Sequence, residues 1–362
     1  MGHQVGLTGE PLRGIMFGAG SIAPHQALAW RAVDEVRIVG VVDREPDRAQ
    51  RLIDEIGLTG AVASASLDDA LAAVGDCADF VDVATPPELH VEHVAAVARR
   101  GLHVLCQKPF TPTVAEARQV IHICEEAGVR CVVNENWRWR DWYQEAARIL
   151  AEGVVGSPRF ASFTCHRDLV LPSPDGGLPS LLVRQPYTRT MERLIVFEWG
   201  IHLIDVLRML LGPVRSVYAV VDRTSPLVVG EDRAVIQLEH VSGARSLVDI
   251  SWGSVTRTDR RLIRGNVEPF VLEGDAGTLE LDPFAGDQLS VTTASGTSVA
   301  DARRGLPPAE AYQRSFESCQ RHFAQSLLAG VPAVNEAADN LQPLAAALAV
   351  YESAAVGRPV AL

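Results

Sequence analysis

Apolar runs alternate with helical patterns along the first 135 residues of the chain. Each run is short, and the run at residues 36–42 is continuously apolar, as in a strand buried on both faces. The pattern predicts strands at residues 14–17, 36–42, 80–84, 103–106 and 130–134. It predicts helices at residues 22–34, 47–56, 67–74, 88–100 and 114–127. Because strands that alternate with helices form parallel sheets, we expect residues 1–136 to be an α/β domain with a doubly wound parallel sheet.

The pattern changes after Asn136. Longer strands, often alternating in polarity, are predicted at residues 159–166, 216–222, 234–240, 244–252, 269–273, 278–281 and 288–293. Helices are predicted at residues 141–152, 196–211, 309–328 and 335–356. Turn pairs such as Ser242-Gly243 indicate antiparallel connections. Residues 137–362 are therefore expected to be an α+β domain with a large, mostly antiparallel sheet, and the C-terminal helix is expected to pack back on the first domain. Residues 167–193 show no assignable periodicity.

Composition narrows the class of protein. Apolar residues make up 47% and charged residues 22% of the 362 residues, which is typical of a globular protein. No run approaches the roughly 18 apolar residues of a membrane span, and the first residues do not resemble an export signal, so we expect a cytoplasmic protein. A net charge of −12 disfavours nucleic acid and membranes as partners. The six cysteines form no CxxC pair.

A glycine-rich turn follows the first predicted strand. Gly18, Gly20 and Ala23 form the G-x-G-x-x-A fingerprint, in which the glycines allow a tight turn and a close approach to a pyrophosphate. Ser21 and Ile22 open the next helix, whose N-terminus favours an anion.

A carboxylate supports the dinucleotide interpretation. Asp43 ends the second strand, roughly 20 residues after the glycines, where a carboxylate accepts hydrogen bonds from the ribose hydroxyls. It would repel a 2′-phosphate, so NAD is favoured over NADP. Arg44 beside it can stack on adenine or tolerate that phosphate. An ordinary turn residue is the alternative role for Asp43.

Several segments in order resemble the Gfo/Idh/MocA oxidoreductases, the family of glucose–fructose oxidoreductase and inositol dehydrogenase. The matching segments are the glycine fingerprint, Ala84-Thr85-Pro86-Pro87-Glu88-Leu89-His90, Gln107-Lys108-Pro109, Glu198-Trp199-Gly200-Ile201-His202-Leu203-Ile204-Asp205 and Gly357-Arg358-Pro359-Val360. The resemblance implies a Rossmann domain with NAD, whose lining includes Thr85, Pro86, His90, Gln107 and Lys108. It also implies an open-faced second sheet through which a homodimer or homotetramer forms.

A catalytic set follows from this resemblance and from residue chemistry. His202 is the candidate base, because the pKa of an imidazole lies near neutrality. Glu198 lies four residues earlier on the same predicted helix face. Lys108 is the only lysine among 33 basic residues, and its ammonium would stabilise a developing alkoxide. The family typically has Glu where this chain has Gln107 and Asp where it has Glu198. A structural role for Asp205 is implied.

Substrate residues are less clearly indicated. Trp137 stands in a tryptophan cluster whose rings can stack on a sugar or simply pack between domains. Arg138 and Arg189 are further candidates for binding substrate, together with His202, Glu198 and Lys108. The expected substrate is a sugar, cyclitol or sugar derivative that is oxidised at a secondary hydroxyl.

Two alternative functions remain open. Some relatives in the family retain NAD and use transient oxidation to cleave glycosidic bonds, and a noncatalytic dinucleotide sensor would use the same scaffold. His90 and His93 have H-x-x-H spacing but no further ligands, so a solvated helix start is expected there and no metal is predicted.

Overall fold

A computed structural model describes residues 10–75, 77–173, 176–255, 268–282, 288–301 and 305–362. The chain divides into two compact units. The first runs to Asn136 and includes Gln313–Leu341, and the second contains Trp137–Tyr312 and Gln342–Leu362.

The first unit is built on a six-stranded sheet whose paired strands all run parallel. The strand order is β3-β2-β1-β4-β5-β6, which confirms the doubly wound parallel sheet. The strands are β1 (Leu12–Phe17), β2 (Val36–Val42), β3 (Val62–Ser64), β4 (Phe80–Val83), β5 (His103–Gln107) and β6 (Cys131–Asn134). Because the strand order reverses between β1 and β4, ligands are expected at the carboxyl edge of the sheet there.

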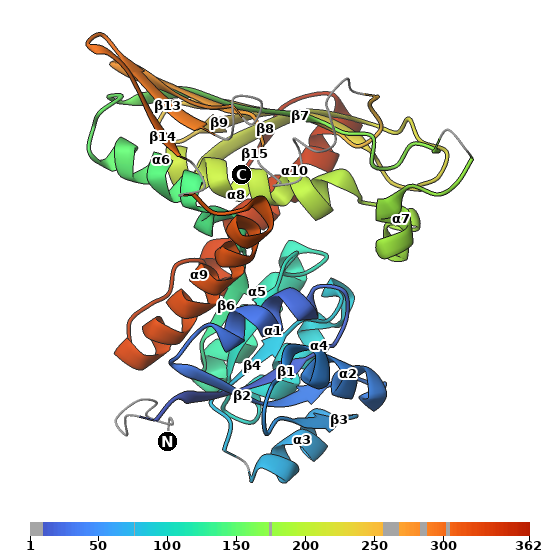
Figure 1. Ribbon diagram of the computed structural model, residues 1–362. Helices are drawn as coiled ribbons and strands as arrows, with labels where there is room; N and C mark the ends of the chain where they lie inside the picture. The colour runs from blue at the N-terminus through green and yellow to red at the C-terminus, as the bar shows by residue number, and fades with distance from the viewer. Residues whose placement is uncertain (1–9, 76, 174–175, 256–267, 283–287, 302–304) are drawn as a thin grey trace. The chain divides into compact units, whose positions relative to one another are not determined.

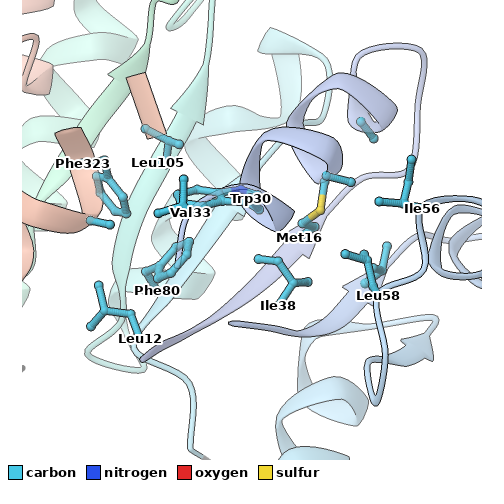
Figure 2. Close-up of a cluster of buried hydrophobic side chains, with 14 of the residues drawn as sticks. Leu12, Met16, Trp30, Val33, Ile38, Ile56, Leu58, Phe80, Leu105 and Phe323 are labelled. Atoms are coloured by element: carbon cyan, nitrogen blue, oxygen red, sulfur yellow. The ribbon is translucent and has the colours of Figure 1, made fainter. Parts of the chain in front are cut away.

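Helices pack against this sheet. They are α1 (Ala23–Arg31), α2 (Pro46–Ile56), α3 (Leu67–Val74), η1 (Pro87–Leu89), α4 (His90–Ala98), α5 (Val114–Ala127) and, late in the chain, α9 (Pro308–Ala329). Figure 2 shows Trp30 of α1, Phe80 of β4 and Phe323 of α9 gathered in one buried cluster. The Phe80 ring centre lies 4.9 Å from that of Trp30 and 5.3 Å from that of Phe323. The core of the first unit therefore includes a helix that follows the second sheet in the sequence.

The second unit contains a nine-stranded sheet. Its order is β14-β13-β12-β11-β7-β10-β9-β8-β15, and every neighbouring pair is antiparallel except β7 with β10. The strands are β7 (Pro158–His166), β8 (Val214–Asp222), β9 (Arg233–His240), β10 (Arg245–Ser251), β11 (Phe270–Gly274), β12 (Gly277–Asp282), β13 (Gln288–Thr293), β14 (Gly296–Asp301) and β15 (Val360–Ala361). The prediction of a mostly antiparallel second sheet is confirmed.

Helices cover one face of this second sheet, where Figure 1 shows α6 and α8. The helical segments are η2 (Trp137–Trp139), α6 (Asp141–Ala151), α7 (Ser180–Arg184), η3 (Pro186–Arg189), η4 (Val196–Gly200), α8 (Ile201–Leu211) and α10 (Ala337–Val356). The other face keeps exposed apolar side chains, among them Tyr218 and Val220 of β8. None of the helices in the described ranges combines the length and hydropathy needed to cross a membrane.

Asp82 is a charged residue type on the central strand β4, and it has no solvent exposure. The indole N–H of Trp30 donates to its Oδ2 atom at 2.7 Å. Burial raises the pKa of Asp82 to about 7, although the Trp30 hydrogen bond acts in the opposite direction. The carboxyl group is therefore protonated in the folded protein at pH values where it ionises in the unfolded chain.

We predict that Asp82→Asn removes part of the dependence of stability on pH. In the wild type, the unfolded chain loses this proton near pH 3.8 and the folded protein near pH 7, so the free energy of unfolding falls as pH rises between those values. Urea unfolding at several pH values should show a flatter dependence for the variant. Asp34→Asn, at an exposed position, is the matched control. Equal slopes for wild type and Asp82→Asn would contradict the assignment.

Candidate active site

The glycine turn between β1 and α1 has the geometry that its sequence predicts. Gly18 has φ +112°, and its N–H donates to the carbonyl oxygen of Val42 at 2.7 Å. A Cβ at Gly18 would lie 2.9 Å from the carbonyl oxygen of Ala84, so only glycine fits without strain. A Cβ at Gly20 would meet nothing within 4 Å, which leaves open space beside the backbone. The backbone at Gly20 is thus unobstructed on the side where the fingerprint predicts the pyrophosphate.

Asp43 braces this turn from the end of β2. Its Oδ2 atom accepts the Ala19 N–H at 2.9 Å, and its Oδ1 atom accepts the Glu45 N–H at 3.0 Å. The residue is 8% exposed, whereas the neighbouring Arg44 is exposed. Each carboxylate oxygen keeps further acceptor capacity, so the group fits a ribose hydroxyl as a ligand.

The start of α1 fits an anion. Ile22 is its N-cap, and no side chain of the described residues caps the helix there. Ser21 is exposed and Ile22 is half-buried, while Ala23 is fully buried and lets the helix pack closely on the sheet. Within this first turn the Ala23 N–H donates to the carbonyl oxygen of Gly20, the His25 N–H donates to that of Ile22, and Pro24 has no N–H, so it is the helix dipole that favours a phosphate at this position.

The segment after β4 differs in part from its prediction. Thr85 is half-buried and Pro86 is exposed at the carboxyl edge of the sheet. His90 is fully buried, and its ring nitrogens lie 2.8 Å from the carbonyl oxygens of Phe110 and Thr85. The predicted cofactor contact of His90, like the predicted solvated helix start, is therefore wrong: the imidazole joins two backbone segments. His93 bonds Thr85 Oγ1 at 3.0 Å.

Gln107 and Lys108 end β5 at the same edge of the sheet. The Gln107 Oε1 atom accepts the Lys108 backbone N–H at 2.6 Å, and Gln107 is 8% exposed. This bond turns the Gln107 side chain toward its own backbone. Lys108 is half-buried.

His202 lies in the first turn of α8 in the second unit and is 4% exposed. The indole of Trp137 stacks on the imidazole, with ring centres 4.5 Å apart and planes within 4°. The guanidinium carbon of Arg140 lies 3.5 Å from the centre of the same indole. Two planar groups this close cannot share one face, so they cover both faces of Trp137. Neither face is therefore open for the predicted stacking on a sugar, and the side chains that cover Trp137 belong to the second unit, so these contacts are not the predicted packing between domains either.

Arg138 also forms its side-chain hydrogen bonds within the protein. Its Nε and Nη2 atoms donate to the two carboxylate oxygens of Asp205 at 2.7 and 2.6 Å. Both side chains are almost completely buried. The prediction that Arg138 binds substrate is thus replaced by a structural one, in which it anchors α8 through Asp205.

Glu198 lies in η4, a π-helical turn that precedes α8, and is half-buried. The Tyr187 hydroxyl donates to its Oε1 atom at 3.1 Å. Burial and the Glu198 carboxylate raise the pKa of Tyr187, so its phenol remains a donor. Arg189, two residues after Tyr187 in η3, is exposed and stays a candidate for binding substrate.

A carboxylate that the sequence did not indicate holds the start of η4. The Glu231 side chain accepts the backbone N–H groups of Leu194 and Val196 at 3.0 and 3.1 Å. The Tyr351 hydroxyl donates to it at 2.7 Å. Glu231 thus caps the helix that carries Glu198 and His202. Its partners lie more than 30 residues away in sequence, so no local pattern reveals them.

Family models match both parts of the chain. A model of an oxidoreductase family with an NAD-binding Rossmann fold, GFO/IDH/MocA, matches residues 12–135, and the C-terminal domain model of the same family matches residues 143–280. The chain belongs to the Gfo/Idh/MocA family. It is therefore an oxidoreductase that binds NAD, as the sequence predicted.

Relatives of this Gfo/Idh/MocA member act on sugars. A D-apiose dehydrogenase of Rhizobium rhizogenes is 33% identical over 96% of this chain and 97% of its own length. A D-apiose dehydrogenase of Paraburkholderia graminis is also 33% identical, over 98% of this chain and 91% of its own. The crystal structure of an Agrobacterium radiobacter oxidoreductase with NAD⁺, L-tartaric acid and magnesium has a TM-score of 0.87, 31% identity, and coverage of 97% of this chain and 98% of that one. The chain is accordingly an NAD-binding oxidoreductase with relatives that are named as sugar dehydrogenases.

Metal ligands are a separate question for this family member. Among its described residues, no group of three or more histidine, cysteine, aspartate or glutamate side chains is arranged to hold a metal ion.

We predict that Asp43→Ala weakens NADH binding by about tenfold or more, because a charged hydrogen-bond acceptor contributes roughly 1.5–3 kcal/mol. The preference for NAD over NADP should also fall, since the repulsion of a 2′-phosphate is removed. Titration of NADH and NADPH fluorescence measures both effects. Arg44→Ala, at the neighbouring exposed position, reports on the alternative in which the guanidinium decides the preference.

Proposed function

We propose that the protein oxidises D-apiose, or a closely related free aldopentose, with NAD as the acceptor. The observation that carries this proposal is the identity of 33% to two D-apiose dehydrogenases over nearly the full length of all three chains. A Haloferax volcanii enzyme named D-xylose 1-dehydrogenase (NADP⁺) 2 is 27% identical over 96% of this chain, which also points to aldopentoses. The glycosidase-like and sensor alternatives gain no support from these relatives.

The proposed chemistry assigns one role to each candidate residue. His202 takes the hydroxyl proton of the substrate, and the Lys108 ammonium stabilises the alkoxide that develops. Glu198, held by Tyr187, accepts a hydrogen bond from a substrate hydroxyl. When bound, the nicotinamide supplies the acceptor for the hydride that leaves the same carbon. The substrate thus loses a proton and a hydride and becomes a carbonyl compound.

We predict that His202→Ala lowers kcat by at least about 100-fold, as expected on losing a general base, while NADH still binds. Lys108→Met should also lower kcat and leave the fold intact. If both side chains serve one carbon, the double variant should lose less than the product of the two single effects. His122→Ala, an exposed helix histidine, is the matched control. Wild-type turnover in both single variants would refute the assignment.

We predict that D-apiose gives the highest kcat/KM in a panel of aldopentoses, hexoses, inositols and sugar acids. A site shaped for five carbons should disfavour a hexose by steric clash with its sixth carbon, and it should reject deoxy analogues because the groups that bond the missing hydroxyl would be left without a partner. Formation of NADH at 340 nm measures the rates, and NADP is tested in parallel. Activity on polyols or sugar acids alone would contradict the proposed substrate class.

We further propose a cytoplasmic homo-oligomer. All six cysteines are free thiols, which is typical of a reducing compartment. On the open face of the second sheet, Val220 and Val235 are paired across β8 and β9 and are 56% and 37% exposed. Such an apolar strip favours contact with another copy. Light scattering of the wild type and of Val220→Glu tests the oligomer.

A further inference from the structure

Glu268 is a fully buried carboxylate in the second unit with three polar partners. Arg140 donates to its Oε2 atom at 2.8 Å, and the Tyr143 hydroxyl donates to the same atom at 3.1 Å. The Arg167 guanidinium lies 3.7 Å from its Oε1 atom. One carboxylate thus holds two arginines, and a buried charge of this kind is costly unless it is paired in this way.

Each of these arginines lies over a tryptophan. The guanidinium carbon of Arg140 is 3.5 Å from the ring centre of Trp137, and that of Arg167 is 5.0 Å from the ring centre of Trp199. A planar guanidinium is attracted to the electron-rich face of an indole. The position of each indole is therefore coupled to an arginine that Glu268 holds.

The series of contacts that passes through Trp137 ends at His202, the proposed base. Arg140 covers one face of the indole and the imidazole of His202 covers the other, 4.5 Å away and nearly parallel. The contacts run from the Glu268 carboxylate to the Arg140 guanidinium, then to the Trp137 indole and from there to the His202 imidazole. Since a parallel stack allows little tilt of its outer ring, the plane of the imidazole follows from this order.

The series of contacts that passes through Arg167 and Trp199 reaches the turn that carries Glu198. Trp199 is the next residue in η4, and its ring meets Trp137 edge-on, with centres 6.4 Å apart. Trp252 stacks on Trp199 at 5.9 Å. Both series of contacts from Glu268 therefore end at the helical segment that carries Glu198 and His202.

We propose that Glu268 is a positioning residue for the dehydrogenase reaction, which sets the plane of the His202 imidazole through Arg140 and Trp137. The inference rests on the proposed function, in which His202 is the base. Glu268 itself takes no part in proton or hydride transfer. Its effect is on kcat, because a base out of plane with the substrate hydroxyl slows the chemical step and leaves binding unchanged.

The test is Glu268→Gln, which keeps the shape of the side chain and removes its charge. We expect kcat to fall by about 10- to 100-fold, by analogy with the loss of a residue that supports a metal-bound histidine. KM for the sugar and the dissociation constant for NADH should change by less than about threefold. Glu336→Gln removes a carboxylate from another arginine pair, Arg130–Glu336 in the first unit, and should keep wild-type kcat.

A spectroscopic readout separates positioning from general damage. In the stacked geometry the indole ring current shifts the ring-proton resonances of His202 upfield, and His202→Ala identifies those resonances by their loss. In Glu268→Gln the shift should decrease. This measurement needs neither cofactor nor activity. Activity of His202→Ala would contradict the proposed function, in which His202 is the base. The upfield shift would still test separately whether Glu268 maintains the Trp137–His202 stack.

A second variant covers the case in which Glu268→Gln does not fold. Trp137→Leu removes the stacking ring without unpairing a charge, and it should lower kcat and abolish the upfield shift. Trp137→Phe, which restores an aromatic face, should recover part of both. Wild-type kcat with unchanged His202 resonances in Glu268→Gln, or in Trp137→Leu, would overturn the proposal.

Discussion

The buried ion pair between Arg138 and Asp205 sets the geometry on which the site in the second unit depends. It joins the turn Trp137–Trp139 to α8 through two hydrogen bonds, and both side chains are shielded from water. Loss of either partner would break this buried ion pair, and breaking such a pair costs roughly 3–5 kcal/mol; the Arg208 guanidinium, 3.8 Å from Asp205, is a second and more distant partner of the carboxylate. Arg138 follows Trp137 directly and Asp205 lies about one helical turn after His202, so the pair ties the segment that carries the indole to the helix that carries the imidazole. The stack is therefore supported by a contact that touches neither ring.

Carboxylates organise both units, but they do so by different means. In the first unit Asp43 accepts two backbone N–H groups and so shapes the glycine turn directly. In the second unit Glu231 accepts N–H groups at the start of a helix, and Glu268 acts through side chains. A backbone bond fixes a loop, whereas side-chain pairs fix the rotamers of the groups beyond them. Rigid support of this kind is what a site needs if its reacting groups are to be held in place before the substrate arrives.

The sequence predicts the features whose causes are local. Strands buried on both faces give continuous apolar runs, and the turn at Gly18 needs glycine, so the first sheet and its fingerprint were both predictable. β3 has three residues and β15 has two, which is too short for a periodic signal. The sequence predicts one continuous helix at residues 196–211, whereas Val196–Gly200 forms a π-helical turn, because one wider turn changes the apolar spacing very little.

Roles that depend on distant partners were not predictable in the same way. The sequence allows Trp137 to stack on a sugar, whereas the structure shows Arg140 and His202 on its two faces. The family motif predicts that His90 contacts the cofactor, whereas in the structure its ring nitrogens lie within hydrogen-bond distance of the carbonyl oxygens of Thr85 and Phe110. Glu268 stands outside every motif. In each case the partner is set by the fold and not by spacing along the chain, so a pattern of residue types identifies the segment but not its contact.

The two departures from the family pattern follow the same logic. Gln107 replaces the usual glutamate, yet its amide oxygen still accepts the Lys108 N–H at 2.6 Å. An amide and a carboxylate both offer an acceptor oxygen, so either residue is able to accept this backbone N–H, and the replacement removes a negative charge beside the ammonium. Glu198 replaces the usual aspartate, and the Tyr187 hydroxyl holds its longer side chain at 3.1 Å. Each replacement therefore changes charge or reach at a position where a hydrogen bond within the protein holds the side chain.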